Sequence, residues 1–245
     1  MIRIPLLCFL LTVFSLTTEA QEPCCHNQAA AQLMVEKALS KVVQPNTRKN
    51  IIADRKTTTN GYDSSCNIES KQLGIRIEEV CAKPKSHKTI NQSADLRMKL
   101  RGLDIDDLYG ALMVRHDFYI DPAEDTKVIE GKNCVIIKFS PKNNLAMREV
   151  SDQFINRVSG SIYIDLDNVT IARIDGSTNH QFYFNYTILG FIHIRVDVYS
   201  FEFSVEYNQF GNMMVEKTVN GLADYEIRSR STEQYINKIS NYRMK

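Results

Sequence analysis

The sequence predicts a mainly β (α+β) protein in which one helix precedes a curved antiparallel sheet. Three observations lead to this prediction. Runs rich in β-branched and aromatic residues follow one another over residues 113–230, with turn residues between them. One amphipathic segment stands ahead of these runs. The longest run changes its apolar parity midway, as a strand does where a sheet bends.

The first twenty residues resemble an export signal. Arg3 supplies a positive start, residues 4–16 are almost entirely apolar, and Thr18 and Ala20 are small residues at −3 and −1 of a cleavage site. The apolar run is shorter than the about 20 residues that a membrane span needs. We expect cleavage near Ala20, a periplasmic or secreted product, and a single mature domain over residues 21–245. A retained signal anchor is the alternative.

Charge gives no reason to expect a nucleic-acid partner. Lysine and arginine number 30 against 29 acidic residues, so the formal net charge is +1. Nucleic-acid binding usually needs a clustered basic face. The sequence therefore predicts neither nucleic-acid binding nor a polybasic membrane patch.

Cysteine usage suits an oxidising compartment but not a zinc site. One of the six cysteines lies in the signal, and no Cys-x-x-Cys spacing is present among the others. We expect two disulfides and one spare thiol, with Cys66 and Cys81 as the nearest local pair, although pairing cannot be read from sequence. The five cysteines of the mature chain are Cys24, Cys25, Cys66, Cys81 and Cys134.

The amphipathic segment predicts a helix over residues 26–43. Its apolar stripe recurs at three- and four-residue steps, and Pro45 restricts Gln44 so that the helix must stop there. We expect this helix to pack over one face of the sheet or to plug it; membrane binding is the alternative. The predicted stripe consists of Ala30, Leu33, Met34, Ala38, Leu39 and Val42.

Between this helix and the strand-rich part, the pattern is less regular. It predicts a turn at residues 57–61, a strand at 73–80, a loop at 83–88 and a short helix at 104–112.

From residue 113 onward the sequence predicts a succession of strands. The expected strands are residues 113–120, 133–139, 161–165, 170–175, 181–188, 192–207, 213–219 and 223–230. Residues 166–168, the pair Gly211 and Asn212, and the pair Asn220 and Gly221 are the expected turns between them. Residues 231–245 fit a capped helix or a last strand about equally.

The parity change in the longest strand predicts a bulge. Apolar side chains occupy even positions up to Val198 and odd positions from Tyr199 onward. Because side chains alternate between the two faces of a strand, this switch requires a bulge or break near these two residues.

The sequence carries no catalytic or metal-binding constellation. The stretch at Gly131 lacks an upstream phosphate-loop glycine, and Ser159 lacks the spacing of a nucleophile elbow. Asp165 and Asp167 start like a calcium loop, but Val169 stands where a ligand belongs. The five histidines are scattered. We therefore expect no enzyme activity, no metal and no cofactor.

Aromatic and apolar residues on two strands are the candidate ligand-binding residues. Three share one face of residues 181–188 and three share one face of residues 192–207. Such sets are commonly ordinary core, and the alternative is the lining of a cavity for a lipid tail. The six candidates are Phe182, Phe184, Tyr186, Phe201, Phe203 and Val205.

A set of short motifs resembles the periplasmic lipoprotein-carrier superfamily, the proteins that sort lipoproteins to the outer membrane. The resemblance covers roughly residues 110–245. It rests on Glu130, Gly131 and Cys134; on Phe139, Ser140, Pro141 and Lys142; on Asp152, Ile155, Asn156 and Arg157; on Gly160, Tyr163 and Asp165; and, more loosely, on Ile171, Arg173, Ile174, Tyr242 and Arg243.

This resemblance implies an incomplete β-barrel wrapped around helices, with an apolar hollow for lipid or lipoprotein acyl chains. It implies a monomer without cofactor or reaction, served by membrane-bound donor or acceptor proteins. Arg115, Arg173 and Arg195 are the candidates for the charged mouth of the hollow. The sequence departs from the family pattern in its five mature cysteines and in having no tryptophan. A structural or interaction domain whose hollow is filled by its own helix is the alternative function.

Overall fold

The computed structural model describes residues 23–42, 51–60, 62–73, 76–81, 112–143, 145–146, 150–188 and 192–244. The predicted export signal, the loop at 83–88 and all but the last residue of the helix at 104–112 lie outside these ranges. The helices are α1 (Pro23–Leu39) and α5 (Val150–Ile155). The strands are β1 (Ile51–Thr59), β2 (Tyr62–Leu73), β3 (Arg76–Cys81), β4 (His116–Ile120), β5 (Thr126–Ile129), β6 (Lys132–Pro141), β7 (Val158–Asp165), β8 (Thr170–Thr178), β9 (Phe182–Ile188), β10 (Ile192–Phe210), β11 (Met213–Glu226) and β12 (Arg230–Met244).

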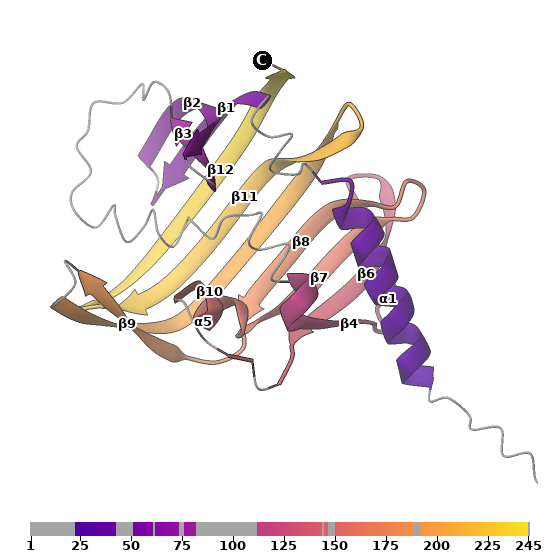
Figure 1. The fold of residues 1–245 in the computed structure, drawn as a ribbon, viewed down its shortest axis with the longest axis horizontal. Coiled ribbons are helices and arrows are strands. Elements are labelled where there is room, and N and C mark those ends of the chain that lie inside the picture. Colours follow the sequence, from indigo (N-terminus) through magenta and orange to yellow (C-terminus); the bar gives the residue numbers. More distant parts are fainter. Residues whose placement is uncertain are drawn as a thin grey trace, which may run out of the picture.

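The strands form one curved antiparallel sheet, which confirms the predicted fold class (Figure 1). The order is β3-β2-β1-β12-β11-β10-β8-β7-β6-β4, with β5 added to β6 and β9 added to β10. The strands at the two ends of this order, β3 and β4, do not pair with each other, so the sheet remains an incomplete barrel. We call the face that α1 covers the inner face and the opposite one the outer face.

Several predicted boundaries are wrong. Residues 112–115 form a helical turn, so the strand expected from residue 113 begins only at His116. The strand expected at 73–80 is instead the end of β2 and the start of β3. The last segment is a strand, β12, and not a helix; it pairs with β1, so the sheet extends well beyond residues 113–230.

The turn expected at Asn220 and Gly221 is also wrong, because β11 runs straight through both residues. The turn that ends β11 comes at residues 227–229. By contrast, Gly211 has φ of +59° and forms the predicted turn between β10 and β11. A left-handed backbone is what glycine supplies in such a turn.

The predicted bulge is confirmed. The register between β10 and β11 shifts between Val198 and Ser200. Val196 and Val198 are buried before the shift, and Phe201 and Val205 are buried after it. At the same point β10 changes its other partner from β9 to β8. The bulge thus lets one long strand belong to two parts of a bent sheet.

Aromatic rings and glycines form a cross-strand row on the inner face. In this row, three rings occupy the space where three glycines would carry a Cβ. A Cβ on Gly160 would stand 2.7 Å from the ring of Phe139, and it would also meet the carbonyl oxygen of Asp175. We define the ring–glycine row as the directly paired residues Phe139, Gly160, Gly176, Phe203, Gly221 and Tyr235, on β6, β7, β8, β10, β11 and β12.

The same contact recurs twice further along the row. A Cβ on Gly176 would lie 2.4 Å from the Phe203 ring, and one on Gly221 would lie 2.0 Å from the Tyr235 ring. Side chains at these glycines would therefore push the rings off the sheet. Gly221 in β11 serves this packing and not a turn.

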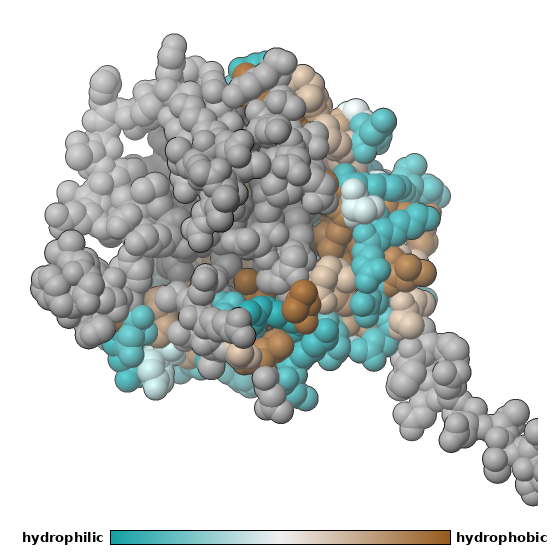
Figure 2. Space-filling view, viewed as in Figure 1, coloured by the Kyte–Doolittle hydropathy of each residue, from teal (hydrophilic) through white to brown (hydrophobic). Residues whose placement is uncertain are grey.

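Helix α1 packs its apolar side on the inner face and covers the β4–β8 part of the sheet (Figure 1). The buried residues of α1 and the turn after it are Ala31, Val35, Ala38, Leu39 and Val42, whereas Ala30 and Leu33 of the predicted stripe are exposed. Hydrophilic side chains run along the side where α1 lies, with apolar patches between them (Figure 2). Neither α1 nor any other helix within the described ranges is long and apolar enough to cross a bilayer.

Both ends of α1 are fixed to the sheet. The Asn27 side chain donates to the Ile120 carbonyl at 2.7 Å and accepts from the Ile120 N–H at 2.9 Å, so it pairs with β4 as a strand residue would. After the helix, the Met214 N–H donates to the Lys41 carbonyl at 2.8 Å, and Val42 forms a parallel bridge with Met214 of β11. The helix is therefore tied to two strands that lie well apart in the sheet.

The ring–glycine contact predicts a strong coupling between Gly221 and Tyr235. We expect Gly221→Ala to destabilise the protein by about 1–3 kcal/mol, because the new methyl group overpacks the ring. In a Tyr235→Ala background the same change should cost nothing or stabilise slightly, since alanine reduces the freedom of the unfolded chain. Denaturant unfolding of the four proteins of this double-mutant cycle measures the coupling. An equal cost in both backgrounds would contradict the contact.

Candidate functional site

Four phenylalanine rings form the centre of an aromatic cluster on the inner face. Phe154 of α5 lies edge-on to the rings of Phe182, Phe184 and Phe201, with centroid distances of 5.0, 5.3 and 5.9 Å. Such edge-to-face pairs stabilise by about 0.5–1.5 kcal/mol beyond their buried area. The aromatic cluster consists of Phe154, Phe182, Phe184, Val196, Val198 and Phe201.

The structure brings together half of the sequence-predicted lining residues. Phe182, Phe184 and Phe201 are in the aromatic cluster, and Phe203 packs against both this cluster and the core under α1. Val205 belongs to the core under α1. The side chain of Tyr186 lies outside the described ones. Their role as ligand-binding residues stays a prediction.

Phe154 was missed by sequence reasoning. It stands in a short polar helix between two strands, where nothing in the local pattern marks a core residue. Arg157, just after this helix, places its guanidinium 4.8 Å from the centroid of the Phe182 ring. The α5 segment thus adds one buried ring and one cation–π contact to the aromatic cluster.

Arg115 is a structural clamp for α5. Its guanidinium lies 2.8 Å from an Asp152 carboxylate oxygen and donates to the Asn156 side-chain oxygen at 2.9 Å and to the Ala146 carbonyl at 3.1 Å. The side chains of Arg115 and Asp152 are only 21% and 12% exposed. This pair therefore joins the helical turn before β4 to the helix that carries Phe154.

The other two candidate arginines lie elsewhere. Arg173 stands opposite Glu206 in the β8–β10 register, and thus on the outer face, next to Asp175. Arg195 is exposed, binds both oxygens of Asp197 and lies 4.3 Å from the centroid of the Tyr183 ring. The three arginines do not converge on one opening, and their role at a cavity mouth stays a prediction.

The cysteines are only partly described. Cys134 is a free thiol buried inside the protein, and this burial, together with the nearby Asp165 carboxylate, raises its pKa above the ordinary value. The β2–β3 register pairs Cys81 with Ile68, two residues from Cys66, so both cysteines belong to the same face of this hairpin. Their side chains lie outside the described ones, and their disulfide stays a prediction.

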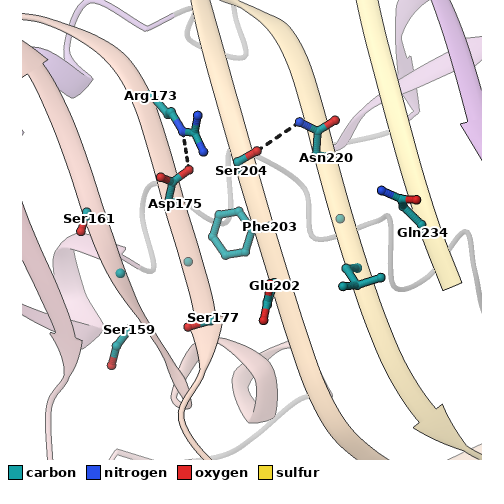
Figure 3. Close-up of a pocket in the computed structure, with 14 residues that line it drawn as sticks. Ser159, Ser161, Arg173, Asp175, Ser177, Glu202, Phe203, Ser204, Asn220 and Gln234 are labelled. Carbon is teal, nitrogen blue, oxygen red and sulfur yellow. Dashed lines mark hydrogen bonds and ion pairs between the residues drawn. The ribbon is translucent and has the colours of Figure 1, made fainter. Parts of the chain in front are cut away.

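A polar groove crosses the outer face of the sheet (Figure 3). It has a volume of about 490 Å³ and runs over β7, β8, β10, β11 and β12. Its sides come from two cross-strand rows that flank the ring–glycine row. The first row is Ser159, Ser177, Glu202, Leu222 and Gln234, and the second is Ser161, Asp175, Ser204 and Asn220.

The hollow of this groove follows from the small side chains that flank it. Between the two rows the sheet presents only backbone, because the side chains of the ring–glycine row point to the inner face. Serines make up four of the flanking positions. Leu222 is 37% exposed and is the one aliphatic side chain of the lining. Sequence reasoning missed the groove, because its residues come from five separate strands.

Ion pairs and hydrogen bonds order the groove's polar groups. Arg173 lies 2.6 Å from Asp175 and 3.9 Å from Glu206, and the hydrogen bond to Asp175 raises the pKa of Arg173 further above its ordinary value. The Asn220 amide donates to the Ser204 hydroxyl at 3.2 Å. The guanidinium charge in the groove is therefore already compensated.

No metal centre is present in the part of the chain that the structure describes, since no three histidine, cysteine or acidic side chains gather there. Asp165 instead orders the turn after β7: its carboxylate accepts the Asp167 N–H at 3.0 Å and the Asn168 amide at 3.2 Å. The turn expected at residues 166–168 is thus confirmed.

No protein-family model matches the chain, and no curated protein matches it. Solved structures resemble it weakly. The LolA superfamily protein NE2245 from Nitrosomonas europaea is 11% identical with a TM-score of 0.39, covering 88% of this chain and 93% of that one. A MucB structure is 10% identical with a TM-score of 0.30, covering 86% and 94%. The Pseudomonas aeruginosa MucA/MucB complex is 10% identical with a TM-score of 0.26, covering 86% and 99%. These values are too low to assign a family or a function.

The clamp predicts that Arg115 contributes more to stability than an exposed arginine does. We expect Arg115→Ala to lower the free energy of unfolding by about 2–3 kcal/mol, because it removes the guanidinium that pairs with a largely buried carboxylate. Arg195→Ala is the matched control and should change the free energy of unfolding much less, since its ion pair is exposed to solvent. Urea unfolding of both variants measures the difference. Equal losses would show that Arg115 does not hold α5.

Proposed function

We propose that this chain is an exported, non-enzymatic protein that binds the acyl chains of a lipid or lipoprotein on the inner face of its open sheet. The observation that carries the proposal is the gathering of aromatic side chains on one face of a curved sheet that does not close. The motifs that resemble periplasmic lipoprotein carriers support the same function.

The site we propose lies between the aromatic cluster and β12. Helix α1 packs over β4 to β8 and over the Val205 and Tyr207 part of β10. Beyond it, Phe203, Ala223 and Tyr225 are only partly buried and pack against the aromatic cluster. The rings of the ring–glycine row add an apolar surface there. An acyl chain placed along these residues would have one of its sides shielded from water.

Reversible burial is enough for a carrier. Each methylene taken out of water contributes about 0.8 kcal/mol, so part of an acyl chain provides micromolar affinity without any charged group. The protein would release the chain to a membrane-bound acceptor with a better site. We propose a monomer that works in the periplasm or outside the cell after cleavage near Ala20.

Two neighbouring residues of β11 provide a matched test of this site. Ala223 packs on the aromatic cluster, whereas Leu222 stands on the outer face. We expect Ala223→Glu to raise the dissociation constant for a fluorescent fatty acid at least tenfold, a loss of about 1.4 kcal/mol in binding free energy. The reason is that a carboxylate would be buried beside the acyl chain. Leu222→Glu should leave the affinity unchanged. The proposal would be refuted if native mass spectrometry of the natural protein detected no bound lipid and the protein also bound no fluorescent fatty acid.

The packing of α1 favours one second candidate, a structural or interaction domain whose hollow its own helix fills. The helix is fixed at both ends and buries Val35 and Ala38 completely. Such a helix would leave no room for a guest beneath it. In this second candidate function, the sheet serves as a scaffold for a protein partner.

Loosening α1 distinguishes the two candidates. Asn27→Ala should lower the free energy of unfolding by about 1–2 kcal/mol, because two hydrogen bonds to Ile120 are lost. Gln28→Ala removes one exposed bond of 3.2 Å to Asp117 and should change little. If the helix fills the hollow, neither variant takes up fatty acid. A folded Asn27→Ala protein that gains fatty-acid binding excludes the second candidate.

A further inference from the structure

We propose that the polar groove on the outer face is a binding site for a short neutral saccharide. This site is separate from the acyl-chain site, since the sheet itself lies between them. The inference rests on the groove's shape, hydrogen-bonding groups and charge, and it does not depend on the function proposed above.

The groove is large enough for a small polar ligand. Its volume of about 490 Å³ falls within the roughly 300–1,000 Å³ that ligand pockets occupy. It is an open groove, and the backbone of the ring–glycine row forms its floor. A ligand of several sugar rings bound along the groove would lie across the strands.

The groups that face the groove match a polyhydroxyl ligand. Ser161, Ser177 and Gln234 present hydroxyl and amide groups that both donate and accept, and Glu202 presents a carboxylate that accepts. A sugar hydroxyl also donates and accepts, so neighbouring hydroxyls can be bound from adjacent strands. The sugar's C–H surface would meet Leu222 and the glycine methylenes of the floor.

The charge of the groove excludes an anionic ligand. Arg173 is compensated by Asp175 and Glu206, whereas Glu202 is exposed and makes no ion pair with any described residue. Phosphate, carboxylate or nucleic acid would therefore meet surplus negative charge. A neutral ligand avoids this cost.

Two further classes of ligand fit less well. A peptide that adds a strand needs an unpaired sheet edge, but β8, β10 and β11 are each hydrogen-bonded on both sides along the groove. An acyl chain needs side chains that are mostly apolar around it, whereas most side chains that line the groove are polar. Because the Phe203 ring packs on Gly176 at the inner face, no ring stacks on the sugar, and the affinity should be in the millimolar range.

Chemical-shift mapping of the full mature protein tests the proposal. The probes are maltotriose, cellobiose and the N-acetylglucosamine disaccharide, with inorganic phosphate as the anionic comparator. We expect saturable shifts for at least one saccharide at the amides of Ser159, Ser177 and Ser204. Ser177→Leu fills the groove and should raise the dissociation constant at least tenfold. Asn208→Leu, an equally exposed change on β10 beyond the groove, should alter it less than twofold.

Each other outcome overturns the inference. No saturable shift with any of the three saccharides, or shifts that map to other residues, would remove the saccharide site. Stronger perturbation of the groove by phosphate would identify an anion site. Equal weakening by Ser177→Leu and Asn208→Leu would show that the groove is not where the sugar binds. The Ser177→Leu variant should bind the fluorescent fatty acid with the same dissociation constant as the natural protein. A failure of the saccharide proposal is therefore distinguishable from a failure of the acyl-chain proposal.

Discussion

The contact of aromatic rings with glycine backbone is the constraint on which the inner face of this sheet depends. Three rings on three strands occupy the space of three absent side chains, in one row that runs from β6 to β12. On the inner face this row provides aromatic surface beside the phenylalanine cluster. On the outer face the row shows only backbone, because its side chains point inward, and the polar groove lies above it. The inner rings and the outer groove thus lie on opposite sides of the same row.

The inner face divides into two regions of different character. Under α1 it is conventional core, with Val35, Ile137 and Ile174 fully buried. Around β9 and the start of β10 it depends on a six-residue helix, whose ring is held in place by the Arg115 clamp. A six-residue helix has little stability of its own, because it is shorter than isolated helices need to be in water. The aromatic cluster therefore depends on an electrostatic contact made outside it.

Sequence reasoning identified the strands and the bend, but not the residues that complete the sites. The parity switch at Val198 and Tyr199 located the bulge, since alternation of side chains along a strand is strictly local. The turn signal at Asn220 and Gly221 misled, because glycine there accommodates Tyr235, a partner on another strand. Leu33 was expected inside, yet Val35 is buried in its place, and only the docking direction of α1 decides between such stripes. Phe154 and the groove become visible only when separate strands are assembled.

The pairing of β1 with β12 sets the order in which this protein can complete its fold. β1 lies near the start of the described chain and pairs with β2 on one side, but its other neighbour, β12, is the last strand, and the turn after α1 is bonded to β11. Contacts this distant in sequence are slow to form, since a long loop must close first. A chain synthesised from its N-terminus would therefore keep β1 open on one side until the final strand is released.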